Sequence, residues 1–261
     1  MIARPPFIPR TEERELHQCG NLLERHKDAL WYATEKVNGF SFSFGRVNGA
    51  FIASARERLI APDESSVFTE AVRGLELESI RLPDGSVVQG ELVGPRIRGN
   101  RYGLFRLQFL AFDMLIDVER MGFNALQSLC RDVGLSMVPL LAVNFHPTPK
   151  NVANYANGQS TISPMVQREG AVFRTMVETV DPFQGRASFK VFATDLKTSV
   201  QKTPKLSDRA LRSNKADHAG KRPAGLLNPG GFAPSNAMNG YGRKIIPQFH
   251  QRARDPSLAL P

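Results

Sequence analysis

Four charged residues lie within or beside apolar, strand-like stretches of this 261-residue sequence, and they are the first candidates for chemistry. They are Lys36, Glu91, Glu169 and Lys190. A charge in such surroundings is costly unless it has a partner or a function. A network of buried ion pairs would explain all four structurally. Lys36, which precedes a run of alternating phenylalanines, is either a solvated residue at the strand edge or a nucleophile.

The four residues belong to short motifs that follow one another along the chain. In order, these are "EKVNG" (35–39), "SAR" (54–56), "GELVGPRIRGNRYG" (90–103), "FLAFD" (109–113), "EGAVFR" (169–174) and "SFKVFA" (188–193). The element KxxG in the first motif is a weak signal by itself. The ordered set is specific, and it resembles that of the covalent nucleotidyltransferases, among them the ATP-dependent RNA ligases of the RNA ligase 2 family. The resemblance covers residues 30–195.

This resemblance implies a reaction in three steps. A lysine amine attacks the α-phosphate of ATP and expels pyrophosphate, AMP passes to a 5′-phosphate of RNA, and a 3′-hydroxyl then displaces AMP to form a phosphodiester. The pKa of about 10.4 of a free lysine leaves little neutral amine at pH 7, and nearby cations and a divalent metal lower the pKa of such a lysine. The resemblance therefore implies ATP and Mg²⁺ (or Mn²⁺) as cofactors, and RNA with nicked or broken ends as the partner.

Motif positions carry the family's catalytic roles over to three residues. Lys36 matches the lysine that becomes bonded to AMP, and Lys190 matches the lysine that grips the α-phosphate. Glu169 resembles the acid that binds the metal or its water, as oxygen-rich magnesium sites require. The three arginines of "GPRIRGNR" either contact phosphates or belong to a solvated loop; they are Arg96, Arg98 and Arg101.

The same resemblance implies an adenosine site. Glu35 matches the residue that accepts a hydrogen bond from the adenine amine, and Arg56 matches the arginine that binds the ribose or the incoming phosphate. Glu91 matches the acid that holds the ribose hydroxyls, because a carboxylate only accepts hydrogen bonds. Phe112 matches the aromatic residue that stacks on the purine, with Phe109 as the alternative.

Three positions depart from the family pattern. Asn38 stands where relatives often carry Asp, Glu57 stands where Asn is frequent, and Phe192 replaces a second lysine found in some relatives. Asn38, the missing second lysine and the basic C-terminal segment favour an alternative function: a nucleic-acid-binding module that keeps the fold and no longer turns over. A DNA ligase core is disfavoured by the "GELVGPRIRGNRYG" motif, and a capping guanylyltransferase by Glu35. The five histidines fall in no nucleophile or metal motif, which disfavours a conventional hydrolase.

The chain pattern predicts the elements that position these residues. Residues 40–44 alternate Phe with Ser, as in a half-buried strand, and Asn48-Gly49 predicts a hairpin to the strand that follows. A helix is expected over 63–77, capped by Asp63 or Ser65. Further strands are expected in segments 86–91, 104–116, 137–145, 170–177 and 187–194, with a helix in 122–134. This order predicts an α+β fold, a nucleotidyltransferase-type adenylation domain on mostly antiparallel sheets with flanking helices.

Composition divides the chain into three parts. We expect an N-terminal lead-in over 1–29 with helical turns, the nucleotidyltransferase domain over 30–196, and a basic, disordered tail over 197–261. The tail holds 12 Lys and Arg against three Asp, together with seven prolines, so the preceding residues carry no net charge. Such a tail favours polyanions without sequence preference, or merely keeps the protein in solution. Two cysteines and no long apolar run predict a cytoplasmic protein without membrane contact.

Overall fold

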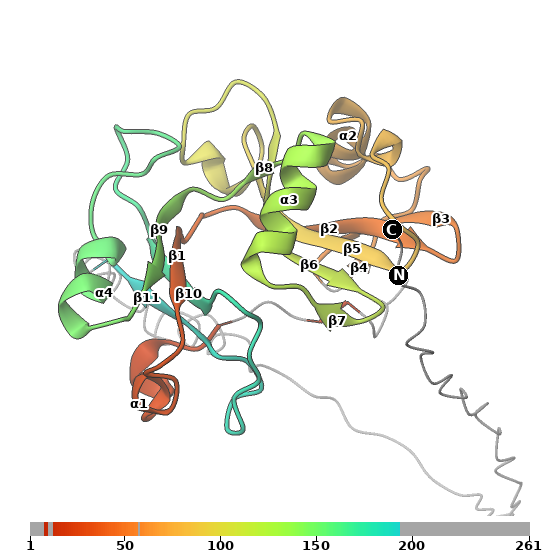
Figure 1. Ribbon diagram of the computed structural model, residues 1–261. Helices are drawn as coiled ribbons and strands as arrows, with labels where there is room; N and C mark the ends of the chain where they lie inside the picture. The colour runs from red at the N-terminus through yellow and green to blue at the C-terminus, as the bar shows by residue number, and fades with distance from the viewer. Residues whose placement is uncertain (1–7, 10–12, 57, 194–261) are drawn as a thin grey trace, which may run out of the picture. The chain divides into compact units, whose positions relative to one another are not determined.

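The fold of this protein is taken from a computed structural model that describes residues 8–9, 13–56 and 58–193. The expected basic tail over 197–261 lies outside these described residues. Two mostly antiparallel sheets with helices around them form the described part (Figure 1), so the predicted α+β class is confirmed. No helix among the described residues is long and apolar enough to cross a bilayer.

The larger sheet contains the predicted hairpin. Its strand order is β4-β3-β2-β5-β6-β7, with β8 parallel to β6. The strands are β2 (Phe40–Val47), β3 (Ala50–Ala55), β4 (Arg58–Leu59), β5 (Ser86–Val93), β6 (Gln108–Ile116), β7 (Glu119–Arg120) and β8 (Ser136–Met137). Phe42 and Phe44 are buried in the core of this sheet, while Ser41 on the other face lines a cavity. The alternation in β2 therefore separates a core face from a cavity face.

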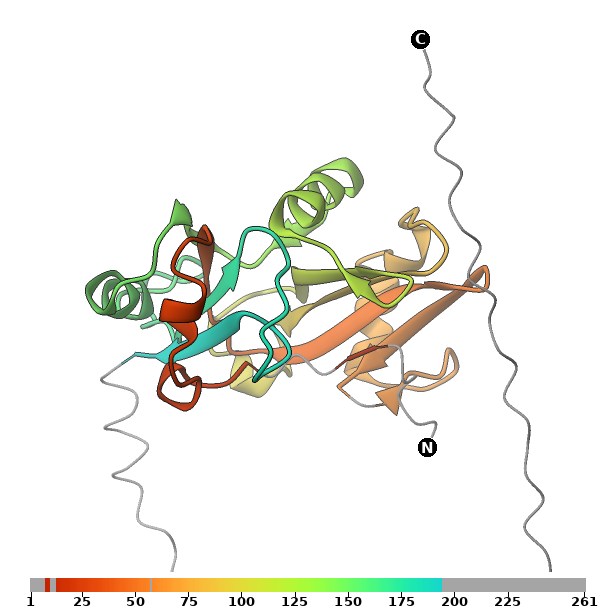
Figure 2. The same cartoon turned by 60° about the horizontal axis from the view of Figure 1, so that its bottom comes forward.

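The smaller sheet brings together strands that are far apart in the sequence. Its order is β11-β10-β1-β9, all antiparallel. In Figures 1 and 2 this sheet lies to the left of the larger one. The strands are β1 (Trp31–Glu35), β9 (Leu140–Phe145), β10 (Gly170–Thr175) and β11 (Ser188–Phe192). Strand β1 was not predicted. All five of its residues are buried, including Thr34 and Glu35, so it shows no alternation of apolar and polar residues.

Helices cover the core face of the larger sheet and flank the smaller one. Apolar residues of α2 and α3 pack into the core of the larger sheet, and α4 packs against β1, β10 and β11. The bounds are α1 (Leu22–Arg25), α2 (Val67–Gly74), α3 (Phe123–Val133), α4 (Pro149–Ala156), η1 (Leu16–Gln18), η2 (Leu77–Ser79) and η3 (Arg98–Asn100). The helix expected over 63–77 is shorter, and its N-cap is Ser66 rather than Asp63 or Ser65. Helix α4 was not predicted.

The segment before β1 is joined to the smaller sheet. Leu22 is fully buried in the hydrophobic cluster of that sheet, which also contains Trp31. Further upstream, the backbone N–H of Lys190 donates to the carbonyl oxygen of Arg14 at 2.9 Å, and Glu15 forms a parallel bridge with Lys190. Arg14 and Glu15 thus lie along the edge of the sheet at β11.

Candidate active site

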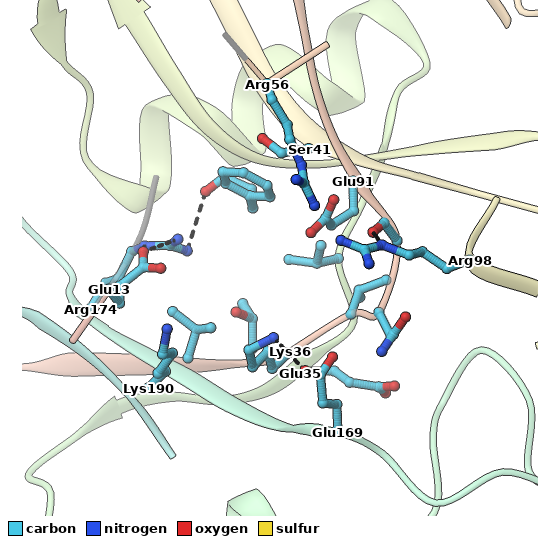
Figure 3. Close-up of a pocket in the computed structure, with 17 residues that line it drawn as sticks. Glu13, Glu35, Lys36, Ser41, Arg56, Glu91, Arg98, Glu169, Arg174 and Lys190 are labelled. Carbon is cyan, nitrogen blue, oxygen red and sulfur yellow. Dashed lines mark hydrogen bonds and ion pairs between the residues drawn. The ribbon is translucent and has the colours of Figure 1, made fainter. Parts of the chain in front are cut away.

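A cavity of about 440 Å³ lies where the two sheets meet, and all seven predicted site residues line it (Figure 3). Glu35 and Lys190 lie in strands of the smaller sheet, and Lys36 and Glu169 lie next to its strand ends. Glu91 and Phe112 lie in strands of the larger sheet, and Arg56 directly follows β3. Other lining residues include Glu13, Asn38, Ser41, Arg98 and Arg174. Predicted site residues separated by up to 155 positions in the sequence therefore meet in one pocket, which the linear order of the motifs could not demonstrate.

Backbone contacts fix the loop that carries Lys36 between β1 and β2. The N–H of Lys36 donates to the carbonyl oxygen of Gly170 at 2.9 Å, and the N–H of Asn38 donates to the hydroxyl oxygen of Tyr102 at 2.7 Å. Gly39 lies so close to β5 that an added Cβ would be 2.5 Å from the carbonyl oxygen of Leu92. This close approach is a physical reason for the glycine in KxxG.

Lys36 forms an ion pair with Glu169 inside the cavity. Its Nζ lies 2.8 Å from Oε1 of Glu169, and the two side chains are 21% and 20% exposed (Figure 3). The same Nζ lies 5.1 Å from the ring centre of Phe192, and Nζ of Lys190 lies 5.7 Å from it. Phe192 therefore places an aromatic ring beside two ammonium groups, where some relatives have a lysine.

Glu35 is buried and already accepts two hydrogen bonds from the chain. Its Oε1 accepts from the hydroxyl of Ser160 at 2.5 Å, and its Oε2 accepts from the N–H of Thr161 at 2.8 Å. Each carboxylate oxygen has a second lone pair available for a ligand. These bonds hold the segment around residue 160 against the end of β1, a contact that the sequence motif did not reveal.

Glu91 lines the cavity and has one carboxylate oxygen without a hydrogen-bond partner among the described residues. This oxygen is Oε2, and it is buried. The pKa of Glu91 is raised to about 8: burial is the main cause and the charge of Glu169 adds to it, while the cations Lys36 and Arg98 oppose the shift. An unpaired buried acceptor is costly, and a hydroxyl group of a bound ligand would satisfy it.

Phe112 lines the cavity, whereas Phe109 packs in the core against Phe42 and Phe44. The guanidinium carbon of Arg174 lies 5.4 Å from the ring centre of Phe112. Of the two phenylalanines that the motif left open, the geometry therefore favours Phe112 as an aromatic surface for a ligand.

Arg174 and Glu13 form a buried ion pair at the cavity wall, which the sequence analysis did not predict. The distances from Oε1 of Glu13 are 3.1 Å to Nε and 2.5 Å to Nη2 of Arg174 (Figure 3). Burial acts to lower the pKa of Arg174, but Glu13 together with Tyr32 and Asp113 outweighs it, and the pKa lies above its ordinary value. Arg174 ends the "EGAVFR" motif and could have been singled out from it, whereas no local signal marks Glu13.

Cations from the larger sheet complete the pocket. Arg56 follows β3 with a positive φ of 51° and lies over the ring of Phe40 at 4.8 Å. A left-handed arginine is strained, and such strain gathers at functional sites. Of the three arginines of "GPRIRGNR", Arg98 lines the cavity, Arg96 pairs with Glu70, and Arg101 donates to the carbonyl oxygen of Gln167.

The acidic residues of the cavity fit a metal ion that is held in part by the phosphates of a bound substrate. Among the described residues, no group of three or more His, Cys, Asp and Glu side chains is placed to hold a metal. Magnesium is often bound by one or two carboxylates together with substrate phosphates and water. Glu169 supplies one such carboxylate in the cavity.

Comparison with known proteins agrees with this geometry. Solved structures of RNA ligase from Naegleria gruberi are similar to this chain. A variant with ATP and Mn is 22% identical with a TM-score of 0.64, and the match covers 76% of this chain and 60% of that chain. A variant with AMP and Mn has the same identity and TM-score, and the match covers 76% of this chain and 59% of that chain. The same ligase with PPi gives 22% identity, a TM-score of 0.64, and coverage of 77% and 60%. This chain thus spans about three fifths of those chains. No curated protein gave a significant match.

The fold is therefore the nucleotidyltransferase type found in RNA ligases. A family model for RNA ligase matches residues 29–192. The chain belongs to the RNA ligase family, as its motifs predicted.

Proposed function

We propose that this protein is an ATP-dependent RNA ligase in which Lys36 forms a covalent bond to AMP. The observation that carries the proposal is the convergence of Lys36, Glu35, Glu91, Phe112 and Lys190 on one cavity from two sheets. The similar structures of another family member contain ATP or AMP with Mn. We therefore propose ATP and a divalent metal as cofactors of this chain, and RNA ends as its partner.

In this proposal the cavity binds ATP through complementary groups. Phe112 offers its ring to the adenine, Glu35 accepts from the adenine amine, and Glu91 accepts from a ribose hydroxyl. The cations Arg56, Arg98, Arg174 and Lys190 face the triphosphate, for which positive side chains are suited. A neutral hydroxyl partner would satisfy the unpaired oxygen of Glu91 in either of its protonation states.

The proposed first step forms a bond between Nζ of Lys36 and the α-phosphorus of ATP. The bond from that phosphorus to the oxygen bridging to the β-phosphate breaks, and pyrophosphate leaves with that electron pair. Lys36 must first lose a proton, and Oε1 of Glu169 lies within hydrogen-bond reach of Nζ at 2.8 Å. Glu169 would also hold the metal, which when bound neutralises phosphate charge. Lys190 then offsets the charge that develops on the α-phosphate.

The experiment that tests the function separates its steps. Protein is incubated with ATP and Mg²⁺, freed from nucleotide, and mixed with 5′-phosphorylated RNA; we expect AMP to appear on the RNA 5′ end and sealed product to follow. Lys36→Ala should abolish both, while Lys27→Ala, which removes an exposed lysine paired with Glu24, should keep both. RNA binding without either product would instead support the non-catalytic binding module, and would refute the ligase.

A further inference from the structure

The loop between β5 and β6 combines positive charge with an exposed aromatic ring. We call residues 94–107 the arginine loop; its arginines are Arg96, Arg98, Arg101 and Arg106. No acidic residue occurs between Glu91 and Asp113, although residues 1–196 carry no net charge overall. Phe105, near the end of the loop, is 99% exposed. The loop is thus a local excess of positive charge that displays an aromatic side chain.

Contacts on both sides of Phe105 hold this part of the loop in place. The backbone of Leu104 exchanges two hydrogen bonds with the side chain of Asn100, at 2.9 and 3.0 Å. Leu104 and Leu107 each pack against a buried apolar cluster. An added Cβ at Gly94 would lie 2.5 Å from the carbonyl oxygen of Arg106, so the start and end of the loop also touch. Phe105 therefore faces solvent from an anchored backbone, and little ordering entropy remains to oppose binding.

The arginine loop is also joined to the segment that carries Lys36. Nε of Arg98 donates to the carbonyl oxygen of Gly39 at 3.2 Å, and the hydroxyl of Tyr102 accepts from the N–H of Asn38 at 2.7 Å. Arg98 itself lines the cavity. A ligand bound along this loop would therefore extend from the neighbourhood of the candidate active site.

We propose that the arginine loop binds single-stranded RNA beside the cavity, with Phe105 stacking on an unpaired base and Arg106 contacting a phosphate. Single exposed apolar side chains are common in proteins, so exposure alone would not support this. Aromatic rings among basic residues are the usual means of holding unpaired nucleotides without base specificity. Arg106 is exposed and forms no ion pair with the residues that the structure describes. The inference rests on the proposed function and states how its RNA would be held.

The test compares Phe105→Ala with Phe183→Ala, which removes a second exposed phenylalanine, 74% exposed, from a different loop. The probe is a 5′-phosphorylated single-stranded RNA with one 2-aminopurine, whose fluorescence falls when the base stacks. All proteins are full length, so the basic segment 197–261 contributes equally. We expect Phe105→Ala to weaken binding about tenfold and to remove the fluorescence change at one probe position. Phe183→Ala should behave as wild type, and Phe105→Trp should retain the fluorescence change.

Two results would overturn the proposal. One is equal RNA affinity and equal fluorescence for Phe105→Ala and wild type. The other is unchanged RNA binding together with a self-association in gel filtration that Phe105→Ala abolishes, which would assign the ring to a protein contact. Formation of lysyl-AMP should be the same in Phe105→Ala and wild type. Absence of lysyl-AMP from wild type would contradict the proposed ligase activity, whereas the RNA-binding comparison would still decide the role of the loop.

Discussion

Glu91 carries a carboxyl group whose charge is disfavoured by its surroundings in the absence of a ligand. Burial raises its pKa from 4.5 to about 8. The folded protein therefore binds this proton more tightly than the unfolded chain does. The stabilisation that the proton provides is complete below about pH 4.5 and is lost as the pH rises through 8.

Replacing Glu91 by Gln should accordingly stabilise the ligand-free protein at high pH. The neutral amide cannot ionise, so the unfolding free energy of the variant should increase relative to that of wild type as the pH rises from 5 to 9. Since one pKa unit corresponds to about 1.4 kcal/mol, the gain in unfolding free energy should reach roughly 4 kcal/mol. Thermal unfolding across this pH range measures it. A difference in Tm that does not change with pH would contradict the raised pKa.

The pair of Glu13 and Arg174 joins the N-terminal segment to the cavity wall, and its side chains are only 9% and 3% exposed. Glu13→Ala would leave the buried guanidinium without its carboxylate, so we expect a loss of about 3–5 kcal/mol in unfolding free energy, measured in urea. Glu24→Ala is the matched control, because Glu24 pairs with Lys27 on the surface and should cost less than about 1 kcal/mol. Equal effects of the two substitutions would show that the buried pair does not stabilise the fold.

The turn between β1 and β2 holds Lys36 in place through close packing against β5. Gly39→Ala would introduce a Cβ 2.5 Å from the carbonyl oxygen of Leu92. The turn must then shift, with an expected cost of about 1–3 kcal/mol and loss of lysyl-AMP formation. Gly74→Ala is the control: no atom lies within 4 Å of its added Cβ, and alanine favours a helix, so stability should be unchanged or slightly higher. Wild-type levels of lysyl-AMP in Gly39→Ala would argue against this role of the glycine.

The sequence predicted those elements that have a clear residue periodicity or a residue typical of a helix end. Strand β2 alternates Phe and Ser, and helix α3 is capped at its C-terminal end by Gly134, which adopts a φ of 73°. Strand β1 lacked such a signal because both of its faces are buried. Lys36 was therefore placed at the start of β2, whereas it directly follows β1.

At the scale of the whole described chain, the candidate site exists only because the two sheets lie against each other and each contributes lining residues. The motifs identified seven lining residues, because each motif lies at a strand end or strand face that meets the cavity. They could not reveal partners from outside the motifs. Glu13 contacts Arg174 across 161 positions, and Ser160 contacts Glu35 across 125 positions. Such pairings depend on the three-dimensional fold and leave no local pattern in the sequence.

The most direct test of this account is to locate the AMP that the protein acquires from ATP. Purified, nucleotide-free protein is incubated with ATP and Mg²⁺, digested at neutral pH, and examined by tandem mass spectrometry. We predict a single acid-labile AMP adduct on the peptide that contains Lys36, absent from Lys36→Ala and present in Lys27→Ala. An adduct on another lysine, or no adduct on folded wild-type protein, would contradict the assignment of Lys36 as the nucleophile.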